Sequence, residues 1–152
     1  MFNRQKIFWK SRKKYLHFKE KGYNILANLF LIKCRLINRK SNSGIPINKN
    51  VNEFYAPHGL SGIYISKKAV IGKSCTIFHQ VTIGSNDLKD SKYYGSPKIG
   101  NNVYIGAGAK IIGNINVGNN VRIGANCVVF KDVPDNVTIV LGEPRILKRK
   151  EK

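Results

Sequence analysis

Branched aliphatic side chains recur every six residues along most of the chain beyond residue 64. A second series of small or aliphatic residues follows most of them by four positions. The first series is Ile65, Ile71, Ile77, Ile83, Ile99, Ile105, Ile111, Val117, Ile123 and Val129. The second is Ala69, Cys75, Val81, Val103, Ala109, Ile115, Val121 and Cys127. A period of six matches neither the turn of an α-helix nor the two-residue alternation of an ordinary strand.

This period predicts an all-β solenoid, a parallel β-helix, over residues 45–144. Each hexad would form one short strand and one corner, and three hexads would complete a coil. Gly and Asn fill many positions between the aliphatics, as in 99–102 and 117–120, and they adopt the left-handed backbone of tight corners at low cost. We therefore expect the aliphatic side chains to stack inward as one continuous core.

The spacing is interrupted once, between Ile83 and Ile99. Sixteen residues separate the two, so one hexad carries about ten extra residues, which predicts an excursion loop over 85–98. A long loop on a regular scaffold usually serves a function, although a plain surface loop is the alternative. We expect the excursion to leave the coil close to the edge that carries two histidines, described below.

Residues 1–44 read as a basic helical segment. Tyr23, Ala27, Phe30 and Cys34 fall at helical spacing. Further apolar residues widen that face: Leu26, Leu29, Ile32 and Leu36. The segment could cap the open end of the solenoid, which would otherwise expose strand edges. It could also rest on an anionic membrane surface, and the two roles are compatible.

The chain carries a net charge of +19, mostly at its two ends, namely the N-terminal segment and a basic tail over 145–152. We expect no nucleic-acid partner, because no recognised binding motif accompanies the charge. No signal peptide is evident, and the apolar run 25–32 is too short to span a bilayer. The three cysteines show neither disulfide nor metal spacing. These features predict a cytoplasmic protein, with the inner face of the membrane as a second location.

Two of the three histidines fall on one face of the predicted coil. Counting hexads back from Ile65 places His58 and His79 about one rung apart, roughly 5 Å in the stacking direction. Histidine titrates near pH 6.5, so a neutral imidazole can take a proton from an alcohol that attacks an acyl thioester. Either histidine alone could be an ordinary outward-facing residue. His17 lies in the basic helix, and we interpret it as a surface residue.

The stretch from about Ile45 to Arg145 resembles the serine O-acetyltransferase branch of the hexapeptide acyltransferases, especially short relatives that acetylate surface polysaccharides. The resemblance is carried by HGLSGIYI, TIFHQVTIG, SPKIGNNVYIGAGAKIIGNINVGNNVRIGANCVV and DVPDNVTIVLGEPR. It implies a left-handed coil, a homotrimer, acetyl-CoA bound between subunits, and direct transfer without a metal or an acyl-enzyme.

Site residues follow from the resemblance, position by position. His58 matches the family's base, and His79 falls where serine acetyltransferases usually carry glutamine, which makes it the second catalytic candidate. The resemblance also implies a set of acetyl-CoA-binding residues: Gly84, Ser85, Ala107, Arg122, Ala125, Pro144 and Arg145.

Three positions depart from the family pattern. Pro57 replaces the aspartate before the catalytic histidine, Pro46 lies near the position of the orienting carboxylate, and Ser96 replaces the loop histidine. Glu53 is a candidate substitute for the lost carboxylate. We therefore expect an acetyl-CoA-dependent O-acetyltransferase whose acceptor is a sugar of a surface polysaccharide precursor. The alternatives are serine acetylation in cysteine biosynthesis and a catalytically lapsed hexapeptide scaffold.

Overall fold

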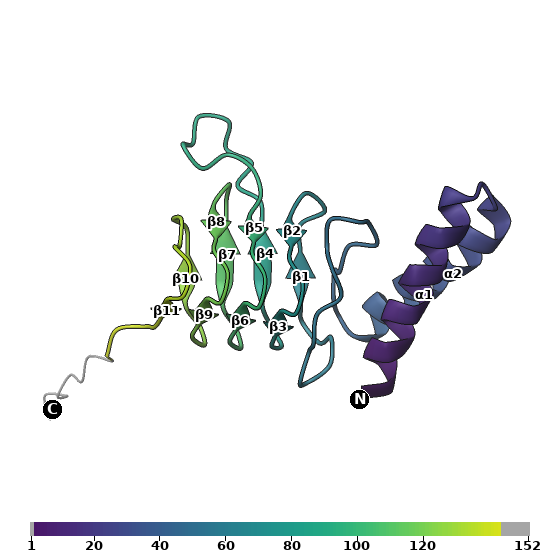
Figure 1. Cartoon of the computed structure of the whole chain (residues 1–152), viewed down its shortest axis with the longest axis horizontal. Helices are drawn as coiled ribbons and strands as arrows, with labels where there is room; N and C mark the ends of the chain where they lie inside the picture. The colour runs from purple at the N-terminus through teal and green to yellow at the C-terminus, as the bar shows by residue number, and fades with distance from the viewer. Residues whose placement is uncertain (1, 144–152) are drawn as a thin grey trace, which may run out of the picture.

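In the computed structural model, which describes residues 2–143, short parallel strands form a three-sided coil with two helices across its first end (Figure 1). The helices are α1 (Phe2–Glu20) and α2 (Asn24–Lys40). The strands are β1 (Tyr64–Ile65), β2 (Val70–Ile71), β3 (Thr76–Ile77), β4 (Thr82–Gly84), β5 (Lys98–Ile99), β6 (Tyr104–Ile105), β7 (Lys110–Ile112), β8 (Asn116–Val117), β9 (Arg122–Ile123), β10 (Val128–Val129) and β11 (Thr138–Ile139).

The strands form three parallel sheets, one on each side of the coil. Sheet A has the order β1-β4-β7-β10, sheet B the order β2-β5-β8, and sheet C the order β11-β9-β6-β3. Aliphatic residues of successive coils pair in register on every side, as Ile83 does with Ile65 and Ile111 on sheet A. The inward positions of both aliphatic series are buried. The structure therefore confirms the parallel coil and the stacked core that the six-residue period predicts.

The corners of the coil are columns of residues with left-handed backbone. The corner between sheets B and C, the BC corner, stacks Ser74, Asn102, Asn120 and Asn136, all with φ between 55° and 60°. The corner between sheets C and A, the CA corner, stacks Gly62, Gln80, Gly108 and Asn126, with φ between 57° and 71°. Asparagine and glycine tolerate this conformation, which explains why they recur between the aliphatics.

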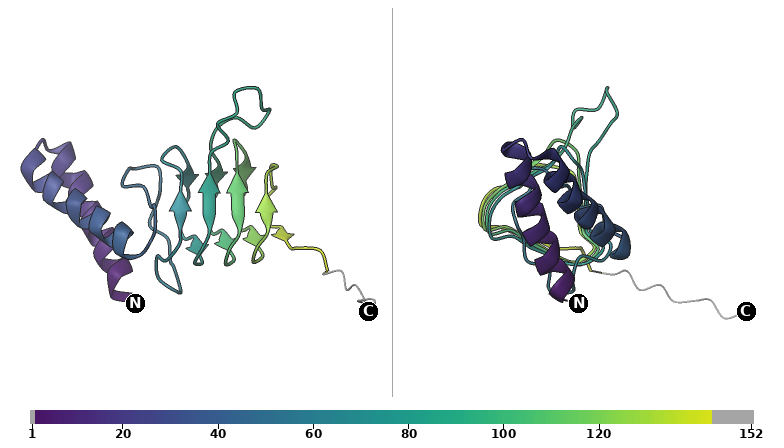
Figure 2. Two further views of the ribbon diagram at one scale, coloured as in Figure 1. Left: turned by 180° about the vertical axis from the view of Figure 1, so that it is seen from behind. Right: turned by 90° about the vertical axis from the view of Figure 1, so that its right-hand side faces the viewer.

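The helical segment is a hairpin rather than one helix. Gly22 ends α1 with φ of 78°, and the N–H of Tyr23 donates to the carbonyl of Phe18, which closes a Schellman motif. Trp9 of α1 packs edge-on against Phe54 of the first coil, with ring centroids 5.1 Å apart. Gln5 donates through Nε2 to the carbonyl of Phe54 at 2.9 Å. The hairpin thus lies across the end of the coil that strands would otherwise leave open (Figure 2).

The apolar face predicted for residues 23–36 is only partly buried. Ala27, Cys34 and Ile37 face the interior. Phe30 and Leu31 are half-buried, and five further apolar residues of α2 stay exposed: Ile25, Leu26, Leu29, Ile32 and Leu36. Among residues 2–143, no helix is long and apolar enough to cross a membrane. The three cysteines are buried free thiols.

Candidate active site

The two histidines predicted to lie one rung apart are in direct contact. Nδ1 of His58 lies 3.0 Å from Nδ1 of His79, and the ring centroids are 4.9 Å apart. In such a contact one nitrogen carries the proton and donates, while the other accepts, so the two rings adopt opposite tautomers. His79 is half-buried and His58 is exposed, which leaves the latter open to a substrate.

The backbone is constrained at both histidines. Pro57 and His58 form the middle of a turn closed by the N–H of Gly59, which donates to the carbonyl of Ala56 at 3.0 Å. Proline restricts its own φ, so it stiffens this turn. His79 precedes Gln80, whose φ of 58° is a left-handed conformation that is uncommon for a residue of this type. The CA corner therefore presents both imidazoles from constrained backbone.

An aromatic row leads from the histidines across sheet C. The ring of Phe78 lies 5.2 Å from that of His58 and 5.1 Å from that of Tyr104. Tyr104 pairs in register with Arg122 on the neighbouring strand. A polar hollow of about 330 Å³ lies beside them, lined by Ser74, Thr76, Asn102, Val103, Tyr104, Asn120 and Arg122. Sequence reasoning missed Phe78 and Tyr104. Their positions beside inward isoleucines were the available signal.

Two of the predicted cofactor-binding residues continue the histidine column. The N–H of Gly108 donates to the carbonyl of His79, and the N–H of Asn126 donates to the carbonyl of Ala107. Ala107 and Ala125 therefore occupy the CA corner of the next two coils. A Cβ on Gly106 would lie 2.6 Å from the backbone nitrogen of Ala125, so these corner backbones stack too closely for a side chain there. The small side chains of Ala107 and Ala125 therefore leave the backbone of the CA corner accessible next to the histidines.

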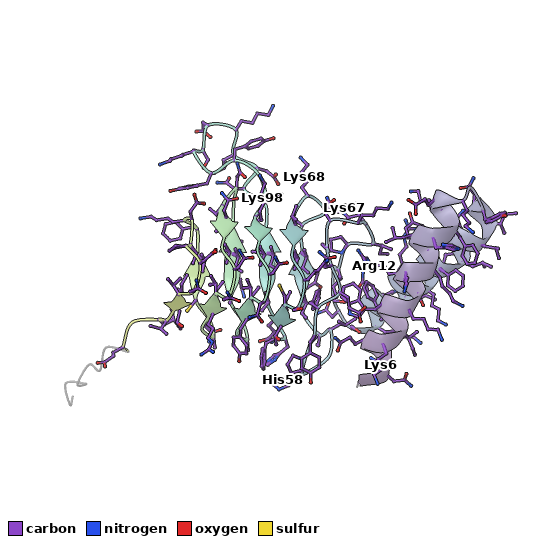
Figure 3. All side chains as sticks on the ribbon, viewed as in Figure 1. Lys6, Arg12, His58, Lys67, Lys68 and Lys98 are labelled. Atoms are coloured by element: carbon purple, nitrogen blue, oxygen red, sulfur yellow. The ribbon has the colours of Figure 1, made fainter. Side chains whose placement is uncertain are left out.

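The excursion does not leave the coil near the two histidines, and the prediction that it would do so is wrong. Gly84 ends β4 and Ser85 follows it at the corner between sheets A and B, the AB corner, whereas the histidines precede β4. Figure 3 shows His58 on one side of the coil and the excursion on the other, beyond Lys68 and Lys98. A full side of the triangle separates the two corners. The structure thus does not bring Gly84, Ser85 or the excursion beside the histidines within one chain.

At the base of the excursion three hydroxyls converge. Oγ of Ser85 lies 2.6 Å from Oγ of Ser66 and 2.7 Å from Oγ of Ser96. Asn86 and Gly95 form an antiparallel bridge just beyond them, which closes the neck of the loop. Ser96, at the position of the family's loop histidine, is therefore held in a hydroxyl cluster at the AB corner.

Glu53, the candidate substitute for the lost carboxylate, does not join the histidine pair. Glu53 lines a hollow beside α1 with Gln5 and Trp9, and the only ion pair within residues 2–143 joins Lys49 to Glu20. No carboxylate therefore pairs with either histidine in the described part of the chain. Pro144 and Arg145 lie outside the described residues. Across residues 2–143 no cluster of three His, Cys, Asp or Glu side chains could hold a metal ion.

Comparison with known proteins identifies the class of repeat that builds the coil and the enzymes whose sequences are similar to this chain. Residues 96–131 match the family described as "Bacterial transferase hexapeptide (six repeats)", so the chain carries the hexapeptide-transferase repeat. Its sequence relatives include the serine acetyltransferase of Synechococcus elongatus, 42% identical over 95 residues that make up 62% of this chain and 38% of that protein. Another is the serine acetyltransferase of Staphylococcus epidermidis, 35% identical over 133 residues, 84% of this chain and 61% of the relative.

Solved structures that are similar to this chain are also serine acetyltransferases. A serine acetyltransferase in complex with CoA is 30% identical with a TM-score of 0.66, covering 86% of this chain and 51% of its own. The serine acetyltransferase of Neisseria gonorrhoeae in complex with serine is 28% identical with a TM-score of 0.61, covering 90% and 54%. The chain is a hexapeptide-repeat protein similar to the serine acetyltransferases, and it spans 38% and 61% of the length of the two sequence relatives.

These findings overturn the expected sugar acceptor. The relatives are named for serine, and one of the structures holds serine. None of these names supports a polysaccharide-modifying branch or a preference for a sugar over serine. The prediction gave too much weight to Pro57 and Ser96. Pro57 adjoins His58 in the chain and Ser96 lies at the AB corner, and neither residue indicates a sugar.

Proposed function

We propose that this protein is an acetyl-CoA-dependent O-acetyltransferase that acetylates the hydroxyl of L-serine. The observation that carries the proposal is the contact between His58 and His79 on a coil similar to serine acetyltransferases that bind serine and CoA. A general base beside an open surface is the group that this reaction requires, because the neutral hydroxyl is a weak nucleophile.

His58 is the base in this proposal, and His79 positions it. If the Nδ1–H of His58 donates to Nδ1 of His79, then Nε2 of His58 carries a free lone pair toward solvent. Nε2 then removes the serine hydroxyl proton while the serine oxygen attacks the thioester carbonyl. The C–S bond breaks, and the imidazolium returns its proton to the leaving sulfur. His79 thus supplies the acceptor that a carboxylate would supply in the family pattern, but without its negative charge.

The proposed acetyl-CoA site uses two corners of the coil. Ala107 and Ala125 would line the arm of the ligand along the histidine column, and Arg122 would meet its phosphates through charge-assisted hydrogen bonds. Gly84 and Ser85 lie at the far corner of sheet A, so they can join this site only from a second copy. This requirement supports a homotrimer in which each groove is formed by two subunits, and we propose that its coils wind left-handed.

Two histidine variants test the proposal. We expect His58→Ala to lower kcat with L-serine by a factor of about 10²–10⁴, the usual contribution of a general base, while acetyl-CoA binding stays unchanged. His17→Ala is the matched control, because His17 is exposed on α1, and it should leave kcat unaffected. Unchanged turnover in His58→Ala would remove this residue from the mechanism.

The role of His79 is separated by two further variants. His79→Gln keeps a hydrogen-bond acceptor in the side chain, whereas His79→Ala removes it. If His79 positions His58, the glutamine variant should retain most of the rate and the alanine variant should lose about tenfold or more, with the loss in kcat rather than KM. Equal losses in the two variants would show that His79 acts in another way.

A further inference from the structure

The outer side of α2 carries an apolar row that nothing in the described chain covers. Ile25, Leu29, Ile32 and Leu36 are 82%, 59%, 52% and 50% exposed. Their spacing of four, three and four residues puts them on one face of the helix. This face is opposite the buried face of Ala27, Cys34 and Ile37. We call it the outer row of α2. Four large aliphatic side chains on one exposed face are more than scattered surface residues.

Basic side chains border the outer row on both sides. At about 100° per residue, Lys33 and Lys40 lie along one edge of the row, and Arg35 and Arg39 lie along the other. All four are exposed, and α2 contains no acidic residue. Long basic side chains beside an apolar face can extend past it to reach charged groups, which is the arrangement of helices that lie in a membrane interface.

The neighbouring helix strengthens the same positive field. Arg4, Lys6, Lys10, Lys13 and Lys14 of α1 are exposed, and Nζ of Lys14 lies 5.1 Å from the ring centre of Phe30 on α2. The single acid of the two helices, Glu20, is paired with Lys49 at 2.8 Å, and this hydrogen bond lowers its pKa. No free negative charge on the hairpin opposes an anionic partner.

We propose that the outer row of α2 docks on an anionic lipid surface, with its four aliphatic side chains in the interface and the bordering Lys and Arg on the headgroups. Charge decides between this occupant and a second copy of the hairpin, because pairing two such faces would bring two sets of basic side chains together. The helical hairpin lies at one end of the coil, so docking through it leaves the CA corner free (Figure 2). This proposal is independent of the reaction catalysed.

Vesicle sedimentation of the full chain tests it. We expect the protein to sediment with vesicles of phosphatidylglycerol and phosphatidylcholine at low salt, and much less with phosphatidylcholine alone. Binding should weaken steeply with added salt, because screening removes the attraction between exposed charges. Equal binding to both vesicle types, or binding to neither, would overturn the proposal.

Paired variants separate the apolar and the charged parts of the surface. Leu29→Asn with Ile32→Asn should weaken binding to the anionic vesicles more than tenfold, since the aliphatic burial is lost. Arg35→Gln with Arg39→Gln should weaken it about thirtyfold, from the usual contribution of each basic residue at an anionic surface. The matched controls are Leu88→Asn with Val128→Asn and Lys89→Gln with Lys131→Gln, exposed residues of the coil and excursion that should leave binding unchanged.

Sedimentation velocity in solution tests the competing occupant. If Leu29→Asn with Ile32→Asn keeps the mass of the native assembly and only vesicle binding falls, the outer row faces lipid. A smaller assembly for this variant would mean that the row contacts another copy of the chain, and the proposal would be wrong.

Discussion

Asparagine side chains join the coils at the BC corner as well as forming its turns. Nδ2 of Asn102 donates to Oδ1 of Asn120 at 2.8 Å, and Nδ2 of Asn120 donates to Oδ1 of Asn136 at 3.0 Å. Asparagine therefore stabilises the BC corner in two ways: it tolerates the left-handed φ of the turn, and its side chain forms a ladder of hydrogen bonds between coils. Sequence could predict the first contribution from the repeated Gly and Asn. It could not predict the ladder, because side-chain partners depend on the register between coils.

Substitution of Asn120 separates the two contributions. Asn120→Gly should lose only the ladder, whereas Asn120→Ala should also force alanine into the left-handed region, at about 1–2 kcal/mol more. Denaturant unfolding followed by circular dichroism measures both variants. Equal stability of the glycine and alanine variants would contradict the assigned backbone conformation.

Cys34 gives a second test at the residue scale. Burial raises the pKa of its thiol to about 11, against about 8.5 for a free thiol. We therefore expect no reaction with a thiol reagent at pH 8 in the native protein, and full reaction after unfolding. Because the folded pKa is the higher one, the associated stability is intact below pH 8.5 and is lost as the pH rises toward 11. Cys34→Ala should lose this part of the pH dependence, and an unchanged alkaline profile would contradict the assignment.

At the scale of elements, sequence predicted the strands more accurately than the helices. Every strand of the coil repeats one hexad, so the period alone locates it. The N-terminal segment shows helical spacing only over residues 23–36, and which of its side chains are buried depends on the surface that the helix packs against. Gly22 was the missed signal for the turn between α1 and α2, since glycine after a basic last helical turn is a common helix end. Sequence also grouped Leu29, Ile32 and Leu36 with Ala27 and Cys34 on one apolar face, whereas the structure exposes the first three and buries the other two.

The cap formed by α1 makes a stability prediction. Phe8 is fully buried in the core cluster that joins the helix to the first coil, so Phe8→Ala should destabilise the protein by about 3–5 kcal/mol. Phe130→Ala is the control, because Phe130 is 53% exposed, and it should change stability by less than about 0.5 kcal/mol. Chemical denaturation measures both. Similar small effects would mean that the hairpin contributes little to the fold.

At the scale of the whole molecule, the proposed site is divided between corners. Hexad counting predicted that His58 and His79 lie about one rung apart, and their side chains are in contact in the structure. It placed the excursion beside the histidines wrongly, because β4 spans a full side of the coil between them. One sequence also cannot show how copies assemble, so the use of both corners is a proposal about the trimer.

Mixed assemblies test that division. His58→Ala damages the CA corner, and Ser85→Tyr should block the AB corner, so each protein alone should be inactive. In a ring where each groove takes one corner from each of two neighbours, co-expression of the two variants restores some intact grooves, up to about a quarter of the native activity. No recovery from correctly folded mixed trimers would contradict a groove shared between subunits.

The central claim is acetyl transfer from acetyl-CoA to L-serine, and its most direct measurement is the release of free CoA thiol by the purified protein. The account predicts release that depends on L-serine, yields O-acetylserine in equal amount, and is lost in His58→Ala. Release with a sugar acceptor but not with L-serine, or no release with any hydroxyl acceptor while acetyl-CoA still binds, would contradict it.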